Sequence, residues 1–149
     1  MKKLVLAVAA LFLLCVPALA GGGLDGFLGS LNVEARADLP GFSSRIGAQF
    51  GVPVPQVQAV IGSVATPADA FMVFQLGQMA HQPPEMVMST YKANRGKGWG
   101  VIAKSLGIKP GSPEFHRLKR GDFVLEGAPA AAPGKGQGKG KGKGKGHNK

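Results

Sequence analysis

Proline and glycine divide the middle of this chain into short segments, and this punctuation is the strongest constraint on its fold. Proline is tolerated in the first turn of a helix but not in its interior, and glycine favours the left-handed residue that ends a helix. Pro67, Pro84 and Pro113 each open a stretch with helical spacing, and Gly51 closes one. Period-two alternation, the pattern of strands, is largely absent. We therefore predict an all-α fold, a compact bundle of five or six short Pro-capped helices in residues 21–125.

Within these segments, the apolar residues recur at the i, i+3, i+4, i+7 spacing of amphipathic helices. The most complete stripes are Leu24/Phe27/Leu28/Leu31, Val57/Val60/Ile61/Val64 and Trp99/Ile102/Ala103/Leu106. The stretch Phe71–Met79 is apolar on most faces. It follows Thr66 and Asp69, which suit an N-cap and a first turn, so we expect it to be the central, mostly buried helix. We expect the first helix to cover residues 24–39 and to stop at Pro40.

The first twenty residues have the form of a secretory signal peptide. Lys2 and Lys3 provide the positive region, residues 4–16 are apolar, and an Ala-Leu-Ala cleavage site ends at Ala20. The apolar run is shorter than the roughly 20 residues that a transmembrane helix needs. Cys15, the only cysteine, lies in this segment, so disulfides and thiolate metal sites are excluded from the mature chain. We predict cleavage after Ala20 and export to the periplasm or the extracellular space.

The C-terminal residues 126–149 are an Ala/Pro-rich linker followed by nearly regular alternation of glycine and lysine. They contain too little apolar surface to offset chain entropy, so we predict a disordered tail. Near an anionic surface each lysine contributes about 1 kcal/mol, screened by salt. Without aromatic residues, the tail has no platform for stacking nucleobases. The predicted anion-binding residues are Lys135, Lys139, Lys141, Lys143, Lys145 and Lys149.

The net charge of +10 is concentrated at the two ends of the chain. Two of the 18 basic residues lie in the predicted signal peptide and six in the tail, which leaves ten basic against eight acidic residues in the body. This balance does not describe a generally basic nucleic-acid-binding domain. A possible secondary basic patch comprises Lys97, Arg117, Lys119 and Arg120.

Residues 96–108 read G-K-G-W-G-V-I-A-K-S-L-G-I. They resemble a GKGWGxIAKxLGI signature of short exported bacterial helical proteins of unknown function. The resemblance implies no activity, cofactor or site residue. From the helical spacing itself we predict that Trp99 is buried against Ile102 and Leu106, and that Phe115 anchors the following helix.

A weaker resemblance, over residues 102–118, is to a helix-turn-helix motif. Its second helix would be suited to a major groove. That helix would present His116, Arg117, Lys119 and Arg120. The segment Lys109–Ser112, however, lengthens the turn beyond the usual three or four residues. With the predicted export signal, this makes nucleic-acid binding the alternative interpretation; the preferred one is that Ala103 and Gly107 allow two helices to approach closely.

Catalytic and metal-binding motifs do not emerge from the sequence. The glycines around Lys97 match neither the P-loop nor the dinucleotide-binding fingerprint. His81 and Glu85 have helical spacing, but Pro83 and Pro84 interrupt the helix that would bring them together. We therefore expect neither enzymatic activity nor a cofactor, with a small periplasmic hydrolase assembled by folding as a remote alternative. The leading hypothesis is an exported binding or structural protein whose tail holds it to lipid headgroups, lipopolysaccharide, wall polymer or extracellular DNA.

Overall fold

The computed structural model describes residues 22–127, which form seven helices and no strand. The predicted all-α fold is confirmed, with seven helices in residues 22–127 where five or six were expected. None of these helices is long and apolar enough to cross a membrane. The predicted signal peptide and the tail lysines lie outside the described residues. The helices are α1 (Leu24–Ala37), α2 (Leu39–Phe50), α3 (Val54–Ile61), α4 (Pro67–Ala80), α5 (Pro84–Ala93), α6 (Trp99–Ser105) and α7 (Pro113–Arg120).

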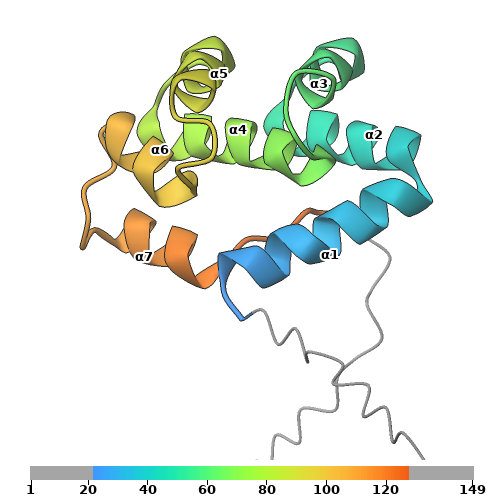
Figure 1. Ribbon diagram of the computed structural model, residues 1–149. Helices are drawn as coiled ribbons and strands as arrows, with labels where there is room; N and C mark the ends of the chain where they lie inside the picture. Colours follow the sequence, from blue (N-terminus) through green and yellow to red (C-terminus); the bar gives the residue numbers. More distant parts are fainter. Residues whose placement is uncertain (1–21, 128–149) are drawn as a thin grey trace, which may run out of the picture.

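Helix α4 is the centre of the fold. It packs against α1, α2, α3 and α5, and every residue from Ala70 to Gly77 is buried. Figure 1 shows α2, α4 and α6 in a middle row, with α3 and α5 on one side and α1 and α7 on the other. At the start of α4, the Asp69 carboxylate accepts a hydrogen bond from the backbone N–H of Thr66 at 3.1 Å. The prediction of a capped, central and mostly buried helix is therefore confirmed.

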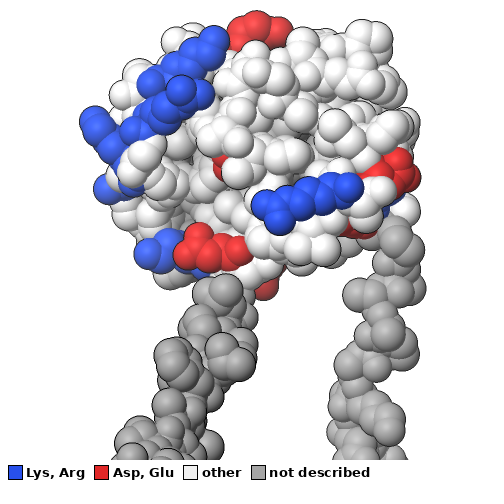
Figure 2. All heavy atoms as spheres, turned by 45° about the vertical axis from the view of Figure 1, so that its right-hand side comes forward, with Lys and Arg blue, Asp and Glu red and all other residues white. Residues whose placement is uncertain are grey.

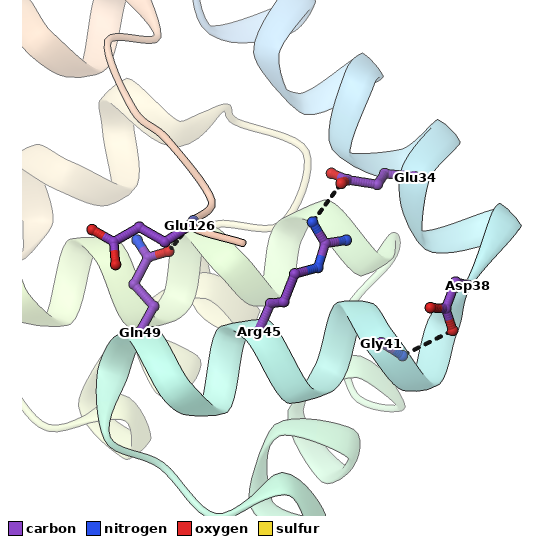
Figure 3. A network of polar contacts seen from close by, with 6 residues as sticks. All are labelled: Glu34, Asp38, Gly41, Arg45, Gln49 and Glu126. Carbon is purple, nitrogen blue, oxygen red and sulfur yellow. Dashed lines mark hydrogen bonds and ion pairs between the residues drawn. The ribbon is translucent and has the colours of Figure 1, made fainter. Parts of the chain in front are cut away.

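The chain breaks between the first two helices at Asp38, two residues earlier than expected. Pro40 does not stop a helix: it lies in the first turn of α2, where the missing N–H of proline costs no hydrogen bond. Asp38 makes this possible because its Oδ1 accepts the backbone N–H of Gly41 at 2.9 Å (Figure 3). The expectation that α1 continues to Leu39 was wrong, since a side-chain cap and a proline together start a new helix there.

Aromatic rings from distant parts of the chain meet around Phe71 of α4. Its ring centroid lies 5.2 Å from that of Phe27 on α1 and 5.5 Å from that of Phe50 on α2. Phe123, which follows the last helix, lies 6.3 Å away and is itself buried. Leu125 is buried as well, so the residues after α7 complete the core although they form no helix.

Polar contacts fasten this final segment to α2. The side-chain amide of Gln49 donates to the carbonyl of Val124 at 3.0 Å and accepts from the backbone N–H of Glu126 at 2.8 Å. One turn earlier, Arg45 of α2 pairs with Glu34 of α1 (Figure 3). These contacts hold the end of the described chain against the bundle.

Candidate functional site

The charges of the described residues are segregated along the chain. Residues 92–120 contain eight lysines and arginines but only one acid, Glu114. All eight basic side chains are exposed. The remaining described residues contain two basic and seven acidic side chains. We call residues 92–120 the basic segment. Its eight basic residues are Lys92, Arg95, Lys97, Lys104, Lys109, Arg117, Lys119 and Arg120. The near-neutral total of the body therefore conceals a strongly cationic C-terminal part.

In space, this segment covers the end of α5, all of α6 and all of α7, and α6 packs against both of the other helices. Figure 2 shows Lys and Arg side chains gathered mainly at one side of the molecule, while much of the remaining surface in that view is uncharged. The four residues of the predicted secondary patch belong to this set. Arg120 pairs with Asp122, and the Arg117 guanidinium lies 5.6 Å from the centre of the Phe123 ring, so two of the four are held by the C-terminal segment.

Three of the four predicted structural anchors are buried, and the fourth is half-buried. Trp99 is 9% exposed, Ile102 and Leu106 are buried with it in the core, and Phe115 is half-buried against the core. Lys97, two residues before Trp99, is exposed. The ring partner of Trp99 is Tyr91 on α5, at a centroid distance of 5.4 Å and an interplanar angle of 27°. The sequence analysis did not single out this pair, although the two residues are the only tyrosine and tryptophan of the chain.

Tyr91 is the centre of a small polar network. Its hydroxyl donates to Oδ2 of Asp69 at 3.2 Å and accepts from the backbone N–H of Ala65 at 3.0 Å. The guanidinium carbon of Arg95 lies 6.0 Å from the centre of the Tyr91 ring, within the range of a cation–π contact. Thus the capped start of α4, the end of α5 and the start of α6 are joined through one side chain.

Beside this network is a cavity of about 380 Å³, which we call the Tyr91–Trp99 cavity. Its polar and aromatic lining consists of Asp69, Tyr91, Arg95 and Trp99, together with Gly96 and Gly98. The backbone at Gly98 has a φ of 88°, a conformation that glycine adopts without the cost of a side chain, and α6 begins directly after it. Sequence reasoning missed Asp69 and Arg95 as neighbours of Trp99 because no spacing rule links α4 to the loop before α6.

A hydrolase site would need a pocket that brings a histidine near an acid. His81 and Glu114 do line one cavity, of about 300 Å³, together with Ser112. The Ser112 hydroxyl already accepts the backbone N–H of Phe115 as the cap of α7. In residues 22–127 the ion pairs are Arg45–Glu34 and Arg120–Asp122, so His81 has no carboxylate partner. The cavity contains groups of the right kinds without the contacts of a nucleophile, base and acid.

The connection between α6 and α7 is longer than that of a helix-turn-helix motif. Helix α6 ends at Ser105 and α7 begins at Pro113, so residues 106–112 separate them. This connection is longer than the three or four residues of the motif. Helix α7 nonetheless exposes His116, Arg117, Lys119 and Arg120. The charge is present, but the turn that orients a recognition helix is not.

Among the described residues, no group of three or more His, Asp or Glu side chains is placed to hold a metal ion. His81 ends α4 in a left-handed conformation, with a φ of 53°, and does not face Glu85 from within one helix. Comparison of the sequence with protein-family models, with curated proteins and with solved structures found no match. The basic segment and the Tyr91–Trp99 cavity are therefore the features from which a function is argued.

Proposed function

We propose that this protein is an exported, non-enzymatic binding or structural protein of the periplasm or cell surface, held electrostatically to an anionic polymer. The observation that supports this most directly is the charge segregation of the folded domain: eight exposed cations and one acid in residues 92–120. Such a predominantly cationic surface attracts polyanions and raises their association rate. It adds a second cationic region to the six lysines of the tail.

The two regions contribute in different ways. The tail lysines lie close together in sequence, and each contributes about 1 kcal/mol near an anionic surface. Five of the basic segment's eight basic residues lie on α5, α6 and α7, and the other three lie in the connections between these packed helices, so their backbone positions have fixed spacing. Binding through both sites at once raises the effective affinity because the second contact is intramolecular. Both contributions weaken with ionic strength, since exposed charges are screened over about 10 Å at 0.1 M salt.

Retention of the mature chain, residues 21–149, on heparin and on anionic vesicles in a salt gradient tests the proposal. Deletion of residues 134–149 is expected to lower the salt concentration at elution strongly. The double substitution Lys104→Gln/Lys119→Gln, at two exposed positions of the basic segment, should lower it further. Arg36→Gln is the matched control, because Arg36 is exposed on α1 outside that segment. Retention that neither the deletion nor the double substitution reduces would refute the proposal.

The same variants separate this function from nucleic-acid reading. A helix-turn-helix-like protein would prefer one duplex sequence, and would lose that preference on Arg117→Ala or Lys119→Ala but not on deletion of the tail. An electrostatically held envelope protein would bind duplexes of different sequence equally, because phosphate contacts carry no sequence information.

A further inference from the structure

We propose that the Tyr91–Trp99 cavity binds a single carboxylate-bearing sugar unit of an anionic glycan. This inference rests on the proposed function and names the class of polymer. The volume of about 380 Å³ lies within the ~300–1,000 Å³ of typical small-ligand sites. The lining has the usual composition of such sites, an aromatic wall with a few convergent polar groups.

The cation for the carboxylate is Arg95. Its side chain is exposed, and neither ion pair of residues 22–127 involves it, although Asp69 lines the same cavity. Its position beside the Tyr91 ring limits the freedom of the guanidinium. A guanidinium offers two parallel N–H donors to a carboxylate, a geometry that lysine does not provide.

A second donor without a hydrogen-bond partner among the described residues belongs to Trp99, which lines the same cavity. The residue is more than nine-tenths buried, yet its indole N–H makes no hydrogen bond to the described residues. No fully buried side-chain nitrogen or oxygen in this part of the chain lacks a partner. The indole N–H is therefore solvent-accessible, and Trp99 lines the cavity.

Asp69 decides between a sugar acid and a phosphate. Its Oδ2 is occupied by the backbone N–H of Thr66 and the hydroxyl of Tyr91, whereas Oδ1 accepts no hydrogen bond from the described residues. The negative charge of Asp69 repels a doubly charged phosphate more strongly than a singly charged sugar carboxylate, and its oxygens accept hydrogen bonds from hydroxyl groups. A ring that carries one carboxylate and free hydroxyls satisfies both Arg95 and Asp69.

Nucleobases fit this cavity less well. Binding of unpaired bases relies on aromatic faces that are free for stacking. The Tyr91 ring is already stacked on Trp99 and covered by Arg95, and Trp99 is too deeply buried to offer a whole face. The cavity thus lacks a free stacking face for a planar base, whereas Asp69 and Arg95 can form hydrogen bonds with the hydroxyl and carboxylate groups of a saccharide.

Trp99 also makes the proposal measurable, because it is the only tryptophan and its emission reports on this site alone. The mature chain, residues 21–149, is titrated in high salt with an oligogalacturonate, with a neutral oligosaccharide of equal length and with inorganic phosphate. We expect a saturable change in Trp99 emission with the galacturonate only. Arg95→Gln should weaken this binding roughly tenfold or more, the loss of one charge-assisted contact. Arg95→Lys should weaken it less.

Arg36→Gln is the matched control, since Arg36 is exposed on α1 and belongs neither to the basic segment nor to the cavity lining. It should leave the titration unchanged. The inference is overturned if galacturonate produces no saturable change, if the neutral sugar or phosphate acts equally, or if Arg95→Gln binds as the original chain does. Failure of the broader proposal is seen separately, as heparin retention that neither deletion of the tail nor Lys104→Gln/Lys119→Gln reduces.

Discussion

Replacement of Trp99 by alanine tests the central structural claim, that the start of α6 is core rather than surface. Trp99 is 9% exposed and stacked on Tyr91 at 5.4 Å. Truncation of a buried tryptophan costs about 3–5 kcal/mol, through lost transfer free energy and the space left behind. The stacked pair accounts for roughly 0.5–1.5 kcal/mol of that amount. We therefore expect Trp99→Ala to lower the free energy of unfolding by about 3–5 kcal/mol.

A domain of this size has a total stability of about 5–15 kcal/mol, so the substitution should remove roughly a fifth to all of it. In thermal terms, the expected loss is roughly 12–40 °C in Tm, at about 4–8 °C for each kcal/mol in a domain of 60–100 residues. Urea unfolding followed by far-ultraviolet circular dichroism measures the change without depending on the tryptophan that has been removed.

Two further variants make that result interpretable. Trp99→Phe keeps an aromatic ring against Tyr91 and should retain a large part of the stability. Lys97→Ala, at an exposed position two residues earlier, should change stability by no more than about 0.5 kcal/mol. A cost below about 1 kcal/mol for Trp99→Ala would refute the reasoning, because a side chain that contributes so little to stability is not part of the core.

Three other predictions concern separate parts of the chain. Tyr91→Phe removes the hydroxyl that bridges Ala65 and Asp69, and should lower the urea-unfolding free energy by about 1–3 kcal/mol; an unchanged value would show that the bridge does not contribute. Phe123→Ala should cost about 3–5 kcal/mol, because this ring packs in the core after the last helix; a cost typical of exposed positions would mean that the C-terminal segment is not docked in solution. Mass spectrometry of the exported protein should find Gly21 as its first residue, and an intact N-terminus would contradict signal-peptide cleavage.

Much of the helical pattern could be predicted from the sequence, because helix starts and stops depend on neighbouring residues. The last helix begins after Ser112, whose hydroxyl accepts the backbone N–H of Phe115, and α2 ends at Gly51 with a φ of 66°. Caps of this kind depend on residues within a few positions of one another. The sequence pattern does not predict the boundary at Asp38, because a proline within a helical stretch indicates a stop. The side chain of Asp38 instead caps a new helix whose first turn contains Pro40.

Only part of the candidate site could be predicted from the sequence. Lys97, Arg117, Lys119 and Arg120 were identified as basic, and their exposure follows from the cost of burying unpaired charges. The grouping of Arg95 and Asp69 beside Trp99 was not identified, because these residues belong to separate elements whose approach depends on packing. Neither spacing nor composition indicates which side of one short helix meets another.

By itself, the sequence of this protein determined where helices start and stop, which of them is most apolar, and where positive charge accumulates, because hydrogen-bond capping, proline geometry and side-chain charge are properties of neighbouring residues. Tertiary structure decided what lies beside Tyr91, how residues after the last helix complete the core around Phe71, and that Arg95 and Asp69 share a cavity without pairing. These outcomes depend on the burial of apolar surface shared among distant segments, a quantity that exists only once the chain has folded.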